Sequence, residues 1–383
     1  MRKKFLRFGA PNFEKKEIDE VVKTLKSGWV TTGVKTHAFE ERFKKYIGAK
    51  YALGLNSCTA ALHLALLGAG VGPGDEVIVP AMTFGASGNT VVHCGATPIF
   101  VDCDRATMNI DPGGIESKIT PRTKAITVVH MAGRACDMDE VFTIAKKHNL
   151  KVIQDAAHAV ETEYKGKKVG AYGDFACYSF HAIKNLVTVE GGMLTSNDKE
   201  AMERSRMLSL HGMSIDAWGR YGTDGYKHYE HLEAGFKYNM MDIQAALGLP
   251  QLARIDRNWK KREKIWQRYM KELQGLPIVL PAPVRKGDRH AYHMFTVLID
   301  TDKTKITRDQ FLDKMAKRNI GTGVHFRALH LHPFYRKTYG YKEGDFPNAE
   351  WIGDRTASIP LSAKLTDKDV SDVIRAIKDI LHT

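Results

Sequence analysis

Lys184 is the residue in this sequence whose setting is best suited to chemistry. It lies in the stretch from residue 174 to residue 195, where short apolar runs flank it and a Glu-Gly-Gly turn follows. Apolar neighbours such as Phe180 and Ile183 lower the pKa of a lysine, so its amine can carry protons or bind a carbonyl carbon as a Schiff base. An ordinary surface lysine between two strands would have the same spacing, so the hypothesis depends on further residues.

A carboxylate upstream of the lysine offers one partner. Asp155 follows the apolar residues Val152 and Ile153 and stands at the C-terminal end of a predicted strand, where ligands of open α/β sheets bind. A carboxylate in this position can hold a proton on a heteroaromatic nitrogen and keep a conjugated ring poor in electrons. A structural aspartate that caps the next turn is the alternative.

Small residues open a predicted helix directly after the first strand of the sheet. They are Ser57, Cys58, Thr59 and Ala60. Unpaired backbone N–H groups, the positive end of the helix and the two hydroxyl groups together favour the binding of a phosphate. The alternative is that Ser57 or Thr59 only caps the helix.

Phe84 and Ser179 extend this set. Phe84 comes just after a strand end and can stack on a flat ring, although an isolated phenylalanine more often packs in a core. Ser179 shares one loop with His181 and Lys184, so a hydroxyl for phosphate and an amine for a carbonyl carbon come from the same segment. A phosphate site, a strand-end carboxylate, an aromatic residue and a loop lysine in this order describe a pocket for pyridoxal 5'-phosphate (PLP).

The elements around these residues alternate between strand and helix. β-Branched runs separated by helical segments predict a mostly parallel sheet covered on both faces, and antiparallel or mixed pairing is expected after residue 180. The predicted strands are residues 51–55, 76–80, 97–102, 124–130, 151–155, 175–180 and 192–196, and the helices between and after them are residues 57–67, 86–93, 137–148 and 198–209.

The remaining segments are expected to frame this α/β unit. The pattern predicts an N-terminal helical arm over residues 1–48, a helical region over residues 242–273 with a bend at Pro250, and a C-terminal unit. That unit contains predicted strands at residues 293–299 and near 322–326, and helices at residues 307–318 and 366–381. We therefore expect a large cofactor-binding domain over residues 1–250 and a small domain over residues 251–383.

Two loops are candidates for ligand or subunit contacts. Residues 27–33 carry Trp29 and Thr31 between glycines, and such a loop either lines a ligand cleft or simply connects two helices. Residues 211–238 are rich in glycine, tyrosine and histidine and are too long for a passive linker.

Composition limits the function classes. The 57 lysines and arginines exceed the 44 acidic residues, which gives a formal net charge of +13. This charge favours anionic ligands, but the basic residues are spread along the chain. No apolar run reaches the roughly 18 residues of a membrane span, no signal peptide is recognised, and the five cysteines form no C-x-x-C pair. We expect a soluble cytoplasmic protein with reduced cysteines.

A metal site is not expected. His325, His330 and His332 cluster near the C-terminal part, but no cysteine or carboxylate lies at a spacing that would complete a ligand set. His325 and Arg327 suit an anionic or hydroxylated substrate equally well.

On these motifs the sequence resembles the DegT-type nucleotide-sugar aminotransferases, which are PLP enzymes of the aspartate-aminotransferase fold, or fold type I. The resemblance implies an α/β fold with a mixed, mostly parallel sheet in the large domain and a smaller α+β C-terminal domain. It covers nearly the whole chain and is carried by residues 28–33, 39–40, 57–62, 74–77, 80–84, 155–158, 179–185 and 190–192.

Within that family the sequence most resembles the enzymes that aminate a UDP-4-keto-pentose on the route to 4-amino-4-deoxy-L-arabinose. The similarity to this group rests on residues 181–185, 211–212, 216–218, 235–239 and 321–327.

The resemblance implies roles for the matching residues. Lys184 would be the Schiff-base lysine and proton carrier, Asp155 the partner of the ring nitrogen, and Phe84 the stacking residue. The other implied contacts are Ser57, Cys58, Thr59, Ala60 and Ser179 with the phosphate, His158 with the ring hydroxyl, and Trp29, Thr31, His181, His325 and Arg327 with the substrate. Position 158 is glutamine in many relatives, so this chain departs from the family there.

Family members are homodimers whose cofactor is also contacted by the neighbouring subunit, usually through the asparagine of a Gly-x-Asn-x-Arg motif. The corresponding residues here are Gly235, Lys237 and Asn239. The resemblance therefore implies that Lys237 reaches the phosphate across the subunit interface.

The implied reaction is a transamination in two steps. L-Glutamate would convert PLP to pyridoxamine phosphate (PMP), which would then aminate a nucleotide-linked keto sugar at C4 of a UDP-4-keto sugar, for lipopolysaccharide or another polysaccharide. Relatives with histidine in place of the lysine are dehydratases, so Lys184 favours transamination.

Two alternatives remain open at this point. One is amination at C3 of a nucleotide-linked 3-keto-hexose. The other, motivated by the charge of +13, is a regulatory nucleic-acid-binding protein with a vestigial cofactor site. Lys184 and the lack of a recognisable helix-turn-helix argue against it, and we expect neither nucleic acid nor membrane as a partner.

Overall fold

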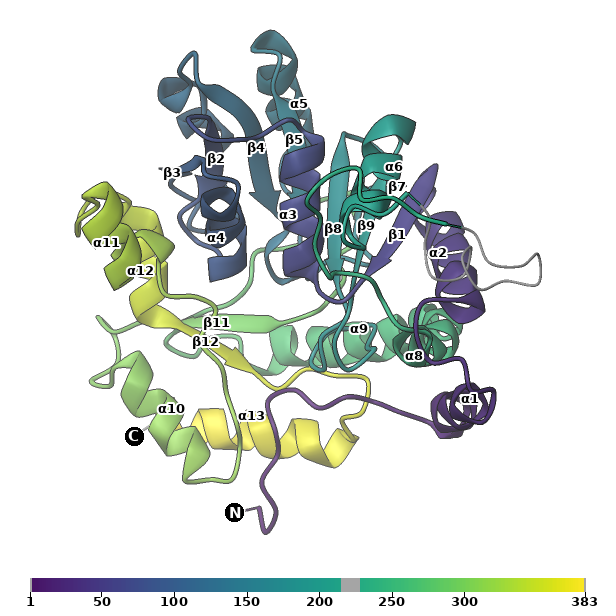
Figure 1. The fold of residues 1–383 in the computed structure, drawn as a ribbon. Helices are drawn as coiled ribbons and strands as arrows, with labels where there is room; N and C mark the ends of the chain where they lie inside the picture. The colour runs from purple at the N-terminus through teal and green to yellow at the C-terminus, as the bar shows by residue number, and fades with distance from the viewer. Residues whose placement is uncertain (1, 215–227, 382–383) are drawn as a thin grey trace.

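A seven-stranded sheet organises the chain, with its strands in the order β1-β9-β8-β5-β4-β2-β3 (Figure 1). The computed structural model describes residues 2–214 and 228–381. The strands are β1 (Tyr51–Leu55), β2 (Glu76–Pro80), β3 (Thr97–Val101), β4 (Thr123–Val129), β5 (Lys151–Asp155), β8 (Phe175–Ser179) and β9 (Gly192–Ser196). The pairs from β3 to β8 are parallel, whereas β9 is antiparallel to both β8 and β1. The predicted sheet, with its change of direction after residue 180, is confirmed.

Apolar side chains cover the sheet on both faces, as β8 shows. Phe175 and Cys177 pack in the apolar cluster that includes α3 (Cys58–Gly68), whereas Ala176 and Tyr178 pack in the cluster that includes α2 (Val34–Ile47) and α8 (Asp242–Ala253). Successive side chains of a strand point to opposite faces, so a strand covered on both faces needs an unbroken apolar run. The other helices of this part are α1 (Lys15–Lys26), α4 (Gly85–His93), α5 (Met138–Lys147) and α6 (Lys199–Leu208).

The direction of the strands brings distant loops to one edge of the sheet. β1, β2, β5 and β8 all run the same way, so they end at the same edge. The segments that follow these strands begin at Asn56, Ala81, Ala156 and Phe180. Residues proposed from four separate parts of the sequence are therefore neighbours at the carboxyl edge, where parallel sheets bind ligands.

A smaller sheet follows in the C-terminal part. Its strands β10 (Ile278–Val279), β11 (Phe295–Ile299) and β12 (Thr356–Ile359) pair antiparallel. The accompanying helices are α9 (Ile255–Glu272), α10 (Arg308–Ala316), α11 (Pro333–Tyr339), α12 (Pro347–Arg355) and α13 (Asp367–Leu381). A short hairpin of β6 (Glu163–Tyr164) and β7 (Lys167–Lys168) lies between β5 and β8 in the sequence.

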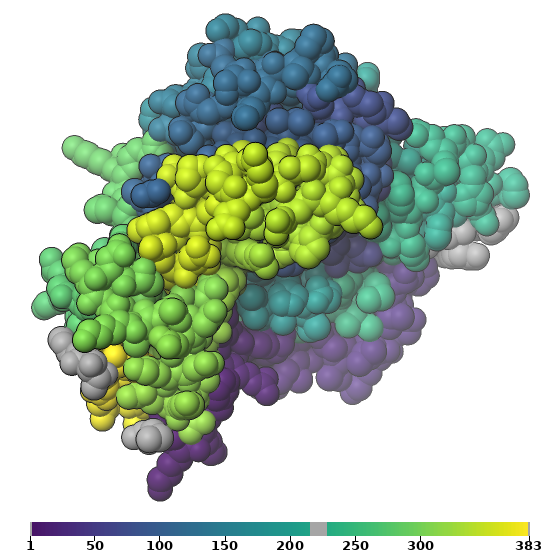
Figure 2. Space-filling view, turned by 90° about the vertical axis from the view of Figure 1, so that its left-hand side faces the viewer, coloured from purple at the N-terminus to yellow at the C-terminus, as the bar shows by residue number. Residues whose placement is uncertain are grey.

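The helices α11 and α12 return to the first sheet, and α12 also packs against Leu298 of β11. Tyr335, Phe346 and Ile352 belong to the same apolar cluster as Leu62 of α3, and the ring of Phe100 lies 5.3 Å from that of Tyr335. Figure 2 shows this yellow-green segment against the blue residues of the first sheet. The domain division near residue 250 stays a prediction.

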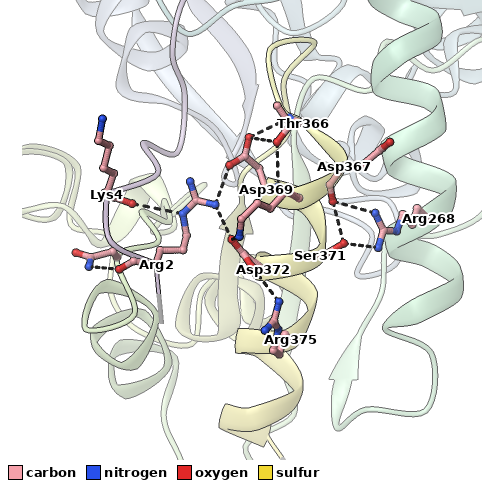
Figure 3. A network of polar contacts seen from close by, with 11 residues as sticks. Arg2, Lys4, Arg268, Thr366, Asp367, Asp369, Ser371, Asp372 and Arg375 are labelled. Carbon is pink, nitrogen blue, oxygen red and sulfur yellow. Dashed lines mark hydrogen bonds and ion pairs between the residues drawn. The ribbon is translucent and has the colours of Figure 1, made fainter.

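The N-terminal arm is tied to the C-terminal helix. Arg2 forms ion pairs with Asp369 and Asp372 of α13 at 2.7 and 2.9 Å, and Arg268 of α9 donates to Ser371 at 2.8 Å (Figure 3). Further along the arm, Leu6 forms a parallel bridge with Ile320. The first residues of the chain thus stabilise the packing of its last helix.

Two sequence expectations are wrong in detail. The helical region of residues 242–273 is divided into α8 and α9, but the break falls at Arg254, and Pro250 lies inside α8. Arg254 has non-helical backbone angles and pairs with Glu14 and Glu17 of the arm at 3.0 and 2.8 Å, so tertiary contacts set the break.

The strand expected near residues 322–326 does not form. Gly323 makes one antiparallel bridge with Ser358, and the neighbouring backbone groups bind elsewhere, with the Gly321 N–H donating to Leu6 and the His325 carbonyl accepting from Thr356. The N-terminal arm is distant from this segment in the sequence, and contacts with it replace the strand pairing.

We expect Gly248→Ala to destabilise the fold. Gly248 of α8 packs against the buried ring of Phe39, and a Cβ there would lie 2.7 to 2.9 Å from three ring atoms. Overpacking costs about 1–3 kcal/mol, and the better helix propensity of alanine recovers up to about 1 kcal/mol of it. Urea denaturation should show a lower free energy of unfolding, and Gly72→Ala, with open space around Gly72, serves as control. Equal stability of Gly248→Ala and wild type would contradict the packing described here.

Candidate active site

A cavity of about 320 Å³ lies at the carboxyl edge of the large sheet. Its wall includes residues expected from three parts of the sequence: Ser57, Cys58, Thr59, Phe84 and Asp155. It also includes His158, Ser179, His181, Lys184 and His325. The structure therefore brings most of the expected site residues into one enclosure.

Asp155 is the buried carboxylate of this cavity. Its side chain accepts hydrogen bonds from the Ser87 hydroxyl at 2.9 Å and from the Ala157 N–H at 3.1 Å, and the residue is 5% exposed. Within residues 2–214 and 228–381, no basic side chain forms an ion pair with it, and burial raises its pKa. A carboxylate held only by neutral donors in a low-dielectric site is stabilised by a cation. A protonated ring nitrogen would supply that cation, so Asp155 fits PLP.

Lys184 comes from the loop between β8 and β9. The Phe180 N–H donates to the Gly191 carbonyl at 2.8 Å and the Thr188 N–H donates to the Phe180 carbonyl at 2.9 Å, which closes the loop. Burial lowers the pKa of Lys184 to about 8, although the nearby charges of Cys58 and Asp155 oppose this shift. An amine with this pKa is partly unprotonated at neutral pH and can attack an aldehyde carbon.

The start of α3 forms the third part of the cavity. The Ala60 N–H donates to the Ser57 hydroxyl at 3.1 Å, so Ser57 is the N-cap that the sequence left as an alternative. The N–H groups of Cys58 and Thr59 have no carbonyl within the helix to bind, and Thr59 is exposed toward the cavity. This end of the cavity fits a phosphate.

The second glycine of the Glu-Gly-Gly turn, Gly192, is the first residue of β9, and its position requires glycine. A Cβ on Gly192 would collide with the carbonyl carbon of Ser57 and with the nitrogen of Cys58. Since the first residue of β9 also pairs with Leu55 of β1 and Ser179 of β8, only glycine lets the strand pass the start of α3 this closely.

Aromatic rings form one wall of the cavity. The ring of Phe84 lies 5.8 Å from that of Phe326, and His158 stacks on His293 at 4.7 Å and lies 6.2 Å from Phe326. Burial lowers the pKa of His158 well below its ordinary value, and its Nδ1 accepts a hydrogen bond from the Ala132 N–H at 3.3 Å. His158 is therefore a neutral ring whose Nε2 carries the proton.

Sequence reasoning missed several residues of the site. His293, Phe326 and Glu190 line the cavity, and Ser87 binds Asp155. Ser87 lies one helical turn after Thr83, and the hydroxyl oxygens of the two residues are 2.8 Å apart. Helical spacing after Phe84 was therefore the signal in the sequence that could have identified Ser87. For His293 the sequence offered only its position beside a predicted strand.

Other expected residues lie away from this cavity. Ala60 is buried behind the start of α3, and Arg327 is exposed and outside the wall. Trp29 donates its indole N–H to the Thr32 carbonyl at 3.0 Å. Thr31 and Lys237 line a second hollow of about 370 Å³. Residues 216–218, part of the resemblance, lie outside the described residues.

Residues 2–214 and 228–381 contain neither a cluster of metal ligands nor a membrane-spanning helix. There, no group of three or more histidine, cysteine, aspartate or glutamate side chains is placed to hold a metal ion. No helix of the described chain has the length and apolar character needed to cross a membrane.

Comparison with protein families gives one match that spans nearly the whole chain. The model of the DegT/DnrJ/EryC1/StrS aminotransferase family matches residues 11–378.

Two curated proteins are similar over their full lengths. An uncharacterized protein of Methanocaldococcus jannaschii is 50% identical over 381 residues, covering 100% of this chain and 99% of that protein. The spore coat polysaccharide biosynthesis protein SpsC of Bacillus subtilis is 49% identical over 381 residues, covering 99% of this chain and 98% of that protein.

Among solved structures, Spr1654 of Streptococcus pneumoniae, which is classed as a sugar aminotransferase, shares the fold. Its PMP form has a TM-score of 0.92 and 35% identity and covers 98% of this chain and 99% of that chain. Its PLP form has a TM-score of 0.91 and 34% identity, with 99% of each chain covered. The predicted α/β fold class, fold type I, is confirmed.

We expect the Lys184 amine of the cofactor-free protein to titrate near pH 8. Its folded-state pKa lies below the ordinary 10.5, so the unfolded chain binds more protons between these values, and stability rises with pH from about 8 to 10.5. Reductive methylation with ¹³C-formaldehyde followed by NMR titration measures this pKa, and Lys184→Ala assigns the signal. A midpoint near 10.5 would show that burial does not lower the pKa.

Proposed function

Because the chain belongs to the DegT/DnrJ/EryC1/StrS aminotransferase family, we propose that it moves an amino group from L-glutamate to C4 of a UDP-linked 4-keto sugar. The chain is a PLP-dependent sugar aminotransferase. The donor, the nucleotide and the C4 position are the proposal, and they rest on the resemblance of residues 181–185 and 321–327 to enzymes that aminate a UDP-4-keto-pentose. The similarity to SpsC supports a product used in a surface polysaccharide, such as lipopolysaccharide.

The observation that carries the proposal is the placement of Lys184 and Asp155 in one cavity that ends at the start of α3. We propose that Lys184 binds the aldehyde carbon of PLP, that Asp155 binds its ring nitrogen, and that Thr59 and Ser179 bind its phosphate. When bound, PLP supplies an electron-poor ring that stabilises negative charge on the carbon that carries the amino group.

Lys184 is the proton carrier in this proposal. With a pKa of about 8, its amine can both take a proton from the amino-bearing carbon and return one near neutral pH. Asp155 would keep a proton on the ring nitrogen, because in the described part of the chain its carboxylate has only the neutral donors Ser87 and Ala157.

Histidine side chains lie near the lysine on the substrate side. Burial lowers the pKa of His325 to about 4, and its Nδ1 lies 2.9 Å from the Ser358 hydroxyl. His181 and Glu190 lie 3.7 Å apart at the cavity wall. We propose that His181 and His325 bind the sugar. Uncharged or solvent-screened side chains suit a hydroxylated ligand better than buried charged side chains do.

We propose further that the enzyme is a cytoplasmic homodimer with shared active sites. Thr31 and Lys237 lie together in the second hollow, away from the cavity that holds the Lys184 of the same chain. This separation is expected if Thr31, Lys237 and Trp29 serve the site of the partner subunit. Arg327 would bind substrate only after a movement of its exposed side chain.

The substrate proposal is tested by half-reactions. Purified protein should bind PLP with visible absorbance, lose that absorbance with L-glutamate, and transfer the amino group to a UDP-4-keto sugar but not to a 3-keto-hexose, with products identified by mass spectrometry. Lys184→Ala should lower turnover by about 10²-fold or more, because it removes the amine that carries the proton. Wild-type turnover in Lys184→Ala would refute the mechanism. Amination of the 3-keto sugar alone would show that the enzyme aminates C3 instead of C4.

Mixed dimers test the shared site. Lys184→Ala and Lys237→Ala each weaken every site of their own homodimer. If each site combines Lys184 of one subunit with Lys237 of the other, a mixed dimer has one intact site, and random mixing should restore up to about a quarter of wild-type activity. If mixing gives no more than the average of the two variants, the two lysines do not serve a common site.

A further inference from the structure

His293 lines the cavity, but the proposed reaction assigns it no role. It precedes β11, is 5% exposed, and its ring stacks on that of His158 at 4.7 Å. It therefore reaches the cavity from the smaller sheet, opposite the residues that follow β5.

The orientation of Asn185 fixes which ring nitrogen of His293 carries the proton. The Asn185 amide donates from Nδ2 to the Ala291 carbonyl and to Glu161 Oε2, both at 3.0 Å, and both of these oxygens only accept. Its Oδ1 therefore faces His293 Nδ1, at 3.1 Å, and must accept from it. Nδ1 carries the proton, which leaves Nε2 with a free lone pair.

A buried ion pair holds this arrangement in place. Glu161 Oε1 accepts from Arg262, and their side chains are 0% and 3% exposed. Glu161 accepts from both the guanidinium and the Asn185 amide, so turning Asn185 round would lose its two donated hydrogen bonds. The series from Arg262 through Glu161 and Asn185 thus sets the tautomer of His293.

His293 Nε2 is buried and has no hydrogen-bond partner among the described residues. Such an acceptor costs about 1–3 kcal/mol if nothing binds it. It is also a poor base, because burial and the charges of Lys184 and Arg262 lower its pKa well below the ordinary value. A buried, neutral acceptor at a cavity wall calls for a hydrogen-bond donor from the ligand.

We propose that His293 Nε2 accepts a hydrogen bond from the substrate at its reacting end, either from the amine N–H or from a hydroxyl next to it. This inference rests on the proposed amino transfer. L-Glutamate and, in the reverse direction, the amino-sugar product each bring a primary amine toward Lys184, the neighbour of Asn185 in the chain. Only the sugar also brings hydroxyl groups. His293 is then a binding residue, and Asn185 is the residue that positions it.

Single-turnover kinetics separate the two sources of the donor. The PLP-loaded protein is mixed with L-glutamate or with UDP-4-amino-4-deoxy-L-arabinose, and the loss of PLP absorbance is followed. Replacing the acceptor in His293→Phe should slow the reaction by about five- to tenfold, the value of one hydrogen bond. Equal slowing with both amines identifies the amine as donor, and slowing with the amino sugar alone identifies a sugar hydroxyl. Unchanged rates with both overturn the inference.

Matched variants separate this role from a structural one. His293→Gln keeps an acceptor and should recover part of the lost rate. His290→Phe replaces another buried histidine of the same segment, outside the cavity wall, and should leave the single-turnover rates unchanged. No recovery in His293→Gln, together with the same loss in His290→Phe, would show that the effect is structural.

NMR of the ring nitrogens gives a readout that does not depend on rate. In PLP-loaded protein labelled with ¹⁵N-histidine, His293 should show a protonated Nδ1 and a bare Nε2 whose signal moves when L-glutamate or the amino sugar is added. Asn185→Ala should release the tautomer. A protonated Nε2, or a signal that moves with neither amine, overturns the inference, whereas a wild type that reacts with neither amine refutes the proposed function itself.

Discussion

Asp155 ends β5 with its carboxylate buried, and among the described residues it is bound only by the Ser87 hydroxyl and the Ala157 N–H. Burial of an unpaired charge costs several kcal/mol, so such a residue either takes up a proton or meets a cation. In our account the cation is the protonated ring nitrogen of PLP. The rest of the cavity follows from this requirement, because the ring must reach from Asp155 to Lys184 and to the start of α3.

The sheet meets this requirement through its topology. β1, β5 and β8 end at one edge, and the antiparallel entry of β9 returns the loop that carries Lys184 to the same edge. Gly192 lets β9 pass the start of α3 without a collision. On the opposite side the chain after residue 290 supplies His293 and His325, held neutral by burial, so the lysine is enclosed by uncharged rings rather than by competing cations.

Much of this arrangement could be predicted from the sequence, for reasons that differ between residues. The strands and helices around Asp155 and Ser57 follow from local apolar patterns, and strand direction then places both at one edge. His293 and Ser87 could not be predicted in this way, because their roles depend on partners such as Asn185 and Asp155 that are distant in the sequence. The break at Arg254 and the irregular segment near Gly323 likewise depend on contacts with the N-terminal arm.

The central claim is that Lys184 holds PLP in the cavity that Asp155 closes. The most direct measurement is to treat the purified, PLP-loaded protein with borohydride, digest it, and locate the phosphopyridoxyl group by mass spectrometry. We expect a single modified peptide with the group on Lys184, and its loss when L-glutamate is added before reduction. Modification of another lysine, or none at Lys184 in protein that carries PLP, would contradict it.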